Sequence, residues 1–313
     1  MKILFVCSGN SKNGISVIIK NQALSLEKYT NELKIEYFII QGKGVIGYLR
    51  NIKPLKKLLK NKSFDIIHAH YSFSAFCASL AGAKPLVVTL MGSDVMGRKI
   101  YKYIIKIFRF IFKWENIIVQ SNEMMETLNI KKVHVIPNGV DLNMFLPMDK
   151  TFSQSQLGWD NKKKNILFPA NPQRNEKNYM LAHKSIYMLN VRDIELHCFD
   201  DTPHEQIPIW FNAADVVLLT SFREGSPNVI KEAMACNRPC VSTNVGDVSI
   251  LFENEKGCFI TEYDPLTCST QIKNAIRYSD RYTNTNGRQR IIDLNLDDES
   301  IANKINTIYK NIL

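Results

Sequence analysis

Residues 215–236 read DVVLLTSFREGSPNVIKEAMAC, and this stretch decides how the chain is interpreted. An apolar strand is expected over residues 215–220, followed by a loop that contains Glu224 and Gly225. We expect a helix to begin at Pro227 with Ser226 as its cap, because serine is favoured as a cap and proline at the first helical position. A strand, a short loop and a helix in this order are typical of a parallel α/β sheet.

The same alternation continues outward in both directions. Strands are expected in the first half over residues 2–7, 34–40, 64–68, 85–90, 116–120 and 133–136. In the second half they are expected over residues 165–168, 194–199, 215–221, 239–242 and 257–260. Helical patterns between these runs predict right-handed crossovers, and therefore two doubly wound, Rossmann-like α/β domains that face each other across a cleft. We place the domains at 1–150 and 151–297, with a terminal helix over 298–313 that can pack back on the first domain.

The surplus of positive charge lies in the first half of the chain. The 313 residues contain 40 Lys and Arg against 30 Asp and Glu. Residues 1–150 hold 22 of these basic residues and 10 of the acidic ones, whereas residues 151–313 hold 18 and 20. An anionic partner is therefore expected for the first domain. We expect no nucleic acid, because no known nucleic-acid-binding motif accompanies the charge.

Five cations in the first half lie at helical spacing. Lys99, Lys102, Lys106, Arg109 and Lys113 step by three or four residues, so they share one face of a helix expected over residues 98–113. The other residues of this helix are mostly Ile, Tyr and Phe. A basic stripe beside apolar side chains suits an anionic membrane surface. We expect a cytoplasmic protein attached peripherally to the inner face of the cell membrane; the alternative is a core helix with a solvated lysine face.

The loop and helix of the opening stretch suggest an anion site. Free backbone N–H groups at a helix start, together with the helix dipole, suit a phosphate or diphosphate. Asn228 and Glu232 lie four residues apart on one helix face, and Glu224 lies at the mouth of the loop. Two carboxylates beside an anion site suit hydroxyl groups, such as those of a sugar or a ribose. The alternative is an ordinary capped helix with a solvated Glu232.

Residues 224–236, together with PCVSTNVGD at residues 239–247, resemble the signature of the retaining glycosyltransferases of family four, which have the GT-B fold. IPNGVD at residues 136–141 is similar to the interdomain linker of that family, and DIIHAH at 65–70 to a strand of its first domain. LMGSD at 90–94 stands where the family often has His-Gly-Ser-Asp. The resemblance runs from residue 1 to about residue 259, which is most of the chain.

The resemblance implies transfer of a sugar from a nucleotide-diphosphate donor to an acceptor hydroxyl, with retention of anomeric configuration. It implies that Glu224 contacts the donor sugar and Glu232 the ribose of the nucleotide. Main-chain contacts to the donor are implied at Gly225, Ser226, Pro227, Asn228 and Val229. The first domain would receive a lipid-linked or polysaccharide-precursor glycan. Because no Asp-x-Asp motif occurs, we expect no metal and no cofactor besides the donor substrate.

Two positions depart from the family pattern. Met91 replaces the usual histidine, so an imidazole near the reacting sugar would come from elsewhere, and His70 is the candidate. The basic pair that grips the diphosphate in the family is five residues apart, whereas Arg174 and Lys177 are three apart. We still expect this pair to contact the diphosphate; the alternative is a solvated basic loop.

Three further residues are expected in loops over the cleft. Asn10 and Gly14 belong to the loop after the first strand, and Asp94 follows Met91. The first loop lacks GxGxxG spacing, so a dinucleotide fingerprint is not met. Two other functions stay open: a GT-B nucleotide-sugar epimerase, and a non-catalytic protein that binds a nucleotide sugar.

Overall fold

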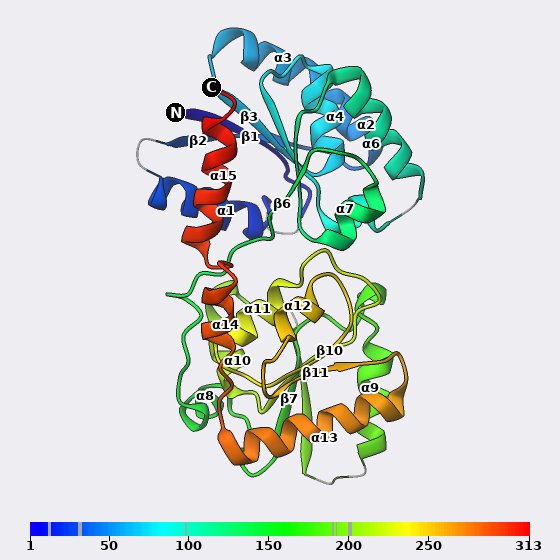
Figure 1. The fold of residues 1–313 in the computed structure, drawn as a ribbon, viewed down its shortest axis with the longest axis vertical. Coiled ribbons are helices and arrows are strands. Elements are labelled where there is room, and N and C mark those ends of the chain that lie inside the picture. The colour runs from blue at the N-terminus through cyan, green and yellow to red at the C-terminus, as the bar shows by residue number, and fades with distance from the viewer. Residues whose placement is uncertain (12–13, 31–32, 98, 190, 192, 200–201) are drawn as a thin grey trace. The chain divides into compact units, whose positions relative to one another are not determined.

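A computed structural model describes residues 1–11, 14–30, 33–97, 99–189, 191, 193–199 and 202–313 in two compact units (Figure 1). Unit 1 comprises Met1–Gly139 and Asp298–Leu313, and unit 2 comprises Val140–Asp297. Each unit has a parallel sheet covered by helices. The predicted fold class, two Rossmann-like α/β domains, is confirmed.

Unit 1 contains a six-stranded sheet of order β2-β1-β3-β4-β5-β6. Its strands are β1 (Lys2–Ser8), β2 (Lys34–Ile40), β3 (Ile66–His70), β4 (Leu86–Thr89), β5 (Asn116–Val119) and β6 (Val133–Val135). Its helices are α1 (Val17–Tyr29), α2 (Gly44–Arg50), α3 (Ile52–Asn61), α4 (Ser72–Leu80), α5 (Gly92–Val95), α6 (Lys99–Phe112), α7 (Asn122–Leu128) and α15 (Asp298–Lys310). The central strands are apolar and buried because helices cover both faces of the sheet.

The terminal helix α15 is anchored to unit 1 by a buried polar contact. The hydroxyl of Tyr309 lies 2.6 Å from Nδ1 of His68 on β3. Nε2 of the same ring lies 2.7 Å from Oγ1 of Thr89 on β4. All three side chains are buried, so this chain of hydrogen bonds satisfies polar groups that would otherwise cost free energy inside the core.

Unit 2 contains a five-stranded sheet of order β11-β10-β9-β7-β8. Its strands are β7 (Lys164–Phe168), β8 (Ile194–Cys198), β9 (Val216–Leu219), β10 (Cys240–Thr243) and β11 (Cys258–Thr261). Its helices are α8 (Lys150–Leu157), α9 (Tyr179–Leu189), α10 (Ile207–Ala213), α11 (Asn228–Ala235), α12 (Val248–Phe252), α13 (Pro265–Tyr282) and α14 (Gly287–Asp293). Short 3₁₀ helices form at η1 (Asn175–Lys177) and η2 (His204–Gln206).

The boundary between the units lies after Gly139, earlier in the chain than the expected residue 150. The guanidinium of Arg288 donates hydrogen bonds of 2.8 Å to the carbonyl oxygens of Leu142 and Phe145. These bonds tie the segment after Val140 to α14, and this is the physical reason that the segment belongs to unit 2.

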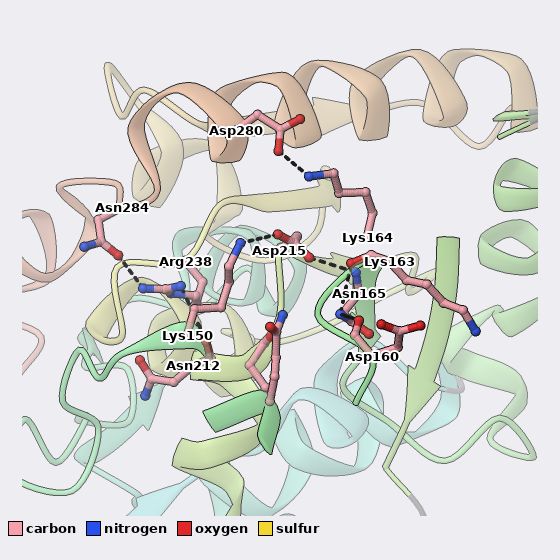
Figure 2. Close-up of polar contacts among 12 residues, drawn as sticks. Lys150, Asp160, Lys163, Lys164, Asn165, Asn212, Asp215, Arg238, Asp280 and Asn284 are labelled. Atoms are coloured by element: carbon pink, nitrogen blue, oxygen red, sulfur yellow. Dashed lines mark hydrogen bonds and ion pairs between the residues drawn. The ribbon is translucent and has the colours of Figure 1, made fainter. Parts of the chain in front are cut away.

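A buried polar network fixes the amino end of β9 (Figure 2). Asp215 precedes the strand; it accepts hydrogen bonds from Nζ of Lys150 at 2.5 Å and from the backbone N–H of Asn165 at 2.8 Å. Arg238, also buried, donates to the side chain of Asn284. Buried charges need such partners. The network therefore holds the base of the strand whose opposite end carries the candidate site.

Among the described residues, no helix combines the length and apolar composition that a membrane span requires.

Candidate functional site

The opening stretch folds as β9, a loop over residues 220–227, and α11. The strand is buried in the sheet between β10 and β7, so its carboxyl end holds the loop in place. The helix begins at Asn228, with Pro227 in the capping position, one residue later than predicted. Within the described part of the chain no side chain caps this helix, so its first N–H groups face outward from the helix end.

Ser226 does not cap α11, which corrects the sequence-based expectation. Its hydroxyl donates instead to Oδ2 of Asp247 at 2.7 Å. Burial raises the pKa of the Asp247 carboxyl. At Gly246, where φ is +60°, an added Cβ would lie 2.6 Å from the carbonyl oxygen of Gly225. The segment with Gly246 and Asp247 therefore packs directly on the β9–α11 loop and holds Ser226 in position.

Glu224 lies at the centre of a compact polar cluster. Nζ of Lys177 lies 2.6 Å from Oε1 of Glu224, and Oγ of Ser221 donates to the same oxygen at 2.7 Å. The Lys177 and Glu224 side chains are 10% and 18% exposed, so the pair is mostly shielded from water. Oγ1 of Thr220 donates to the Lys177 carbonyl oxygen at 3.0 Å, which fixes η1 to the end of β9.

Arg174 stands apart from this cluster. Its guanidinium donates to Oε1 of Glu176 from Nε at 2.9 Å and from Nη2 at 2.7 Å, and its side chain is 56% exposed. The structure therefore brings Lys177 to Glu224, whereas Arg174 is exposed and lies outside this polar cluster. An exposed ion pair such as this one contributes little free energy, so Arg174 can exchange Glu176 for another anion at low cost.

The end of the β9–α11 loop and the first turns of α11 carry the remaining predicted donor-binding residues. Gly225, Ser226 and Pro227 are buried, while Asn228, Val229 and Glu232 are partly exposed. Oδ1 of Asn228 is buried and has no hydrogen-bond partner within the described residues. An unsatisfied acceptor beside uncapped N–H groups is typical of a place where a polar ligand completes the hydrogen bonding. The arrangement can therefore bind an anion and nearby hydroxyl groups.

Two residues of this site were not predicted from the sequence. Ser221 and Asp247 each hold a predicted residue in place, at Glu224 and Ser226 respectively. Asp247 lies within the quoted signature, directly after Gly246, but no spacing rule places a buried carboxylate against a serine 21 residues away.

His70 lies inside unit 1. It is buried, and its ring centroid lies 4.5 Å from that of Phe5 and 4.2 Å from that of His68. Burial lowers the pKa of His70 to about 3, so the ring is neutral. Within the described residues its Nε2 has no hydrogen-bond partner. The packing accounts for His70 as a core residue, and a catalytic role stays a prediction.

Asp94 lies on α5 and is turned inward rather than exposed in a loop. It accepts hydrogen bonds from the backbone N–H of Met91 at 2.7 Å and from Oγ of Ser72 at 2.8 Å. Burial raises the pKa of Asp94 to about 7. These contacts join α5 to the start of α4, so the carboxylate positions backbone in unit 1.

The loop after β1 is anchored at Asn10. Its amide donates to the carbonyl oxygen of Gly42 at 2.9 Å, and its Oδ1 accepts from the backbone N–H of the same residue at 3.0 Å. Gly14 adopts φ +80°, a conformation that side chains other than glycine rarely adopt. Residues 12–13 lie outside the described residues.

The predicted basic stripe lies on α6 and just beyond it. Lys102, Lys106 and Arg109 are half-buried along the helix, and Lys113 is exposed directly after the helix ends. The side chain of Lys99 lies outside the described residues.

Two family descriptions match the chain. Glycosyltransferase Family 4 matches residues 16–144, and Glycosyl transferases group 1 matches residues 164–277, which include the whole β9–α11 segment. The chain belongs to the glycosyltransferases of family 4. As an enzyme of this family it carries its polar cluster, Lys177, Ser221 and Glu224, in the part matched by the second description.

This family 4 glycosyltransferase has relatives of known name. It is 25% identical to the UDP-Gal:alpha-D-GlcNAc-diphosphoundecaprenol alpha-1,3-galactosyltransferase of Escherichia coli over 82% of this chain and 78% of the relative. Among solved structures it is similar to sucrose-phosphate synthase from Thermosynechococcus elongatus, with a TM-score of 0.83, 15% identity and coverage of 100% and 99% of the two chains. It is also similar to Anabaena HepE in complex with UDP and glucose, with a TM-score of 0.78, 17% identity and coverage of 99% and 100%. These structural likenesses establish the GT-B fold.

Proposed function

We propose that this glycosyltransferase moves a sugar from a nucleotide-diphosphate donor to a lipid-linked or polysaccharide-precursor acceptor, with retention of anomeric configuration and without a metal ion. The observation that carries the proposal is the Lys177–Glu224 pair at the carboxyl end of β9, beside the uncapped start of α11. This arrangement places a cation and uncapped backbone N–H groups, which can bind a diphosphate, beside a carboxylate that can accept hydrogen bonds from sugar hydroxyls.

In the proposed reaction, the donor's diphosphate binds to Lys177 and to the backbone N–H groups of Asn228 and Val229. Arg174 releases Glu176 and also binds the diphosphate. Donors arranged in advance around the leaving diphosphate stabilise the negative charge that develops on it. Glu224 accepts hydrogen bonds from hydroxyl groups of the sugar, and Glu232 from those of the ribose. The acceptor oxygen bonds to the anomeric carbon, the bond from that carbon to the diphosphate breaks, and the leaving phosphate takes the acceptor's proton.

The acceptor class is proposed from the relatives and the charge. The Escherichia coli relative is named for a diphosphoundecaprenol-linked substrate. The charge surplus of residues 1–150 exceeds what a donor diphosphate requires. A glycan acceptor held on a membrane lipid, with the enzyme attached peripherally to the inner, anionic face of the cell membrane, accounts for both.

A thermal-shift screen of nucleotide sugars tests the donor step, because a ligand that binds only the folded state raises its apparent stability. We expect one nucleotide sugar to raise Tm, and product analysis with that donor to show slow hydrolysis or transfer. Conversion of the free nucleotide sugar to an isomer would instead identify an epimerase. Binding with no turnover under any condition would identify a binding protein.

A further inference from the structure

The outermost side chains of α6 are apolar rather than basic. Ile100, Tyr103, Ile107, Phe110 and Ile111 are between 54% and 85% exposed. They step by three, four, three and one residues, so they form a single stripe along the helix. Contiguous exposed apolar side chains of this size mark interaction surfaces in soluble proteins.

This outer stripe is separate from the face of α6 that packs into the core. Ile105 is fully buried, and the ring of Phe108 lies 4.3 Å from that of Phe76 on α4. Trp114, just after the helix, donates from Nε1 to Oγ of Ser79 at 2.8 Å. The outer stripe does not belong to the core cluster that Ile105 and Phe108 join.

A cationic stripe runs directly beside the outer apolar stripe. Lys102, Lys106 and Arg109 step by four and three residues and are half-buried. Nη2 of Arg109 donates to the carbonyl oxygen of Lys131 at 2.9 Å. Long basic side chains can lay their aliphatic stems along apolar surface while the charged ends stay in water. Residues 95–114 contain no Asp or Glu. The positive charge on this face therefore has no acidic neighbour in sequence to neutralise it.

Helix α2 adds a second set of exposed apolar side chains. Val45, Ile46 and Leu49 are between 50% and 67% exposed. On its inner side, the ring of Tyr48 lies 5.4 Å from that of Phe73 on α4.

The same α4 ring connects α2 to the segment that carries the outer stripe. The Phe73 centroid lies 5.7 Å from that of Tyr101 on α6. Helices α2 and α6 thus pack on one helix and lie on the same side of the sheet (Figure 1). Residues 37–64, which include α2 and the lysine-rich α3, contain no Asp or Glu.

We propose that α2 and α6 form one docking face that inserts its apolar side chains into an anionic lipid bilayer. The docking face consists of Val45, Ile46, Leu49, Ile100, Tyr103, Ile107, Phe110 and Ile111. Apolar side chains enter the boundary between headgroups and acyl chains, and the neighbouring cations contact the lipid phosphates. Lysine is depleted at protein–protein interfaces, so its abundance here favours lipid over a protein partner. The inference rests on the membrane attachment in the proposed function and deepens it by naming the side chains that enter the bilayer; its purpose is access to a lipid-linked acceptor.

Co-sedimentation with vesicles tests the apolar part of this face. The full chain should bind vesicles of phosphatidylglycerol and phosphatidylcholine, and bind vesicles of phosphatidylcholine alone much more weakly. Phe110→Glu should lower the binding constant by at least about tenfold, because a large apolar side chain no longer leaves water. Tyr187→Glu on α9 is the matched control, since Tyr187 and Phe110 are both 85% exposed, and it should bind as the wild type does.

A second set of variants tests the cations. Lys102→Gln, Lys106→Gln and Arg109→Gln together should lower binding on the order of 100-fold, since each cation near an anionic surface contributes about fivefold. The control carries Lys184→Gln, Lys273→Gln and Arg277→Gln, which remove the same charge from exposed positions of unit 2. Equal effects of the two triple variants would overturn the proposal. Equal binding of the wild type to vesicles with and without anionic lipid would also overturn it. So would a wild-type dimer that Phe110→Glu converts to a monomer.

The donor-binding measurement keeps the two proposals distinguishable. Phe110→Glu and the triple variant of Lys102, Lys106 and Arg109 should keep the nucleotide-sugar Tm shift of the wild type, because these residues lie outside unit 2. Vesicle binding without any nucleotide-sugar shift would leave the docking face standing and contradict the proposed function. A nucleotide-sugar shift without vesicle binding would overturn the docking face, together with the proposed membrane attachment, and leave the proposed donor step standing.

Discussion

Nζ of Lys177 lies 2.6 Å from Oε1 of Glu224, although the two residues are 47 positions apart in the chain. The pair joins η1 to the loop after β9 and keeps a cation and a carboxylate in a mostly buried place. A donor diphosphate competes for the lysine, and sugar hydroxyls compete for the carboxylate. In the proposed reaction, donor binding therefore exchanges one set of charge-assisted hydrogen bonds for another, without leaving either charge alone.

Lys177→Met should weaken donor binding by about 10- to 100-fold, since a hydrogen bond to a charged group contributes roughly 1.5–3 kcal/mol. The measurement is the nucleotide-sugar Kd by titration calorimetry. Lys184→Met, an exposed lysine on α9 of the same unit, is the control and should leave Kd unchanged. Equal Kd values for Lys177→Met and the wild type would remove Lys177 from the site.

Asp247→Ala should weaken donor binding through Ser226, because the buried carboxylate accepts the serine hydroxyl and fixes the β9–α11 loop. Ser226→Ala should have a similar effect, and the double variant should be no worse than the more severe single one. Residues that share one hydrogen bond are coupled by about 0.5–3 kcal/mol in such a cycle. Strictly additive effects on Kd would show that the two side chains act independently.

Asp94 should make stability depend on pH. Burial raises its pKa from 3.8 to about 7, so the folded state binds the proton more tightly than the unfolded state. The stabilising contribution of protonated Asp94 to the free energy of unfolding is fully present below about pH 4 and is lost as the pH rises through about 7. The unfolding free energy of the wild type should therefore fall relative to that of Asp94→Asn by up to about 4 kcal/mol across this range. Urea unfolding at several pH values measures it, and a constant difference would contradict the assignment.

The sequence predicts the strands well because they are short, apolar and buried. The run over residues 2–7 becomes β1 (Lys2–Ser8), and the run over 34–40 becomes β2 (Lys34–Ile40). The sequences of helices α2 and α8 do not show the apolar stripe that predicts a surface helix, for two different physical reasons. Helix α2 contains two glycines and exposes its apolar residues. Helix α8 buries Ser153 and Gln154, so its sequence carries no apolar stripe and is typical of a polar segment.

The site is predicted in its residues but not in its contacts. The spacing of Glu224, Asn228 and Glu232 follows from one helix and its loop, which are local in sequence. The partners of these residues are not local: Lys177 arrives from the loop after β7, and Asp247 from the segment after β10. Such contacts depend on strand order, which a single sequence does not specify. The sequence likewise does not predict that His70 and Asp94 are buried, because their burial depends on how the elements of unit 1 pack together.

The most direct test of the account is the affinity of Glu232→Ala for the nucleotide sugar that raises Tm most in the wild type. We predict that this variant folds with an unchanged circular dichroism spectrum and loses nucleotide binding, because the carboxylate on α11 no longer accepts the ribose hydroxyls. Glu205→Ala, an exposed carboxylate on η2, is the control and should bind as the wild type does. Wild-type affinity in Glu232→Ala would contradict the claim that the β9–α11 segment binds a nucleotide-diphosphate sugar.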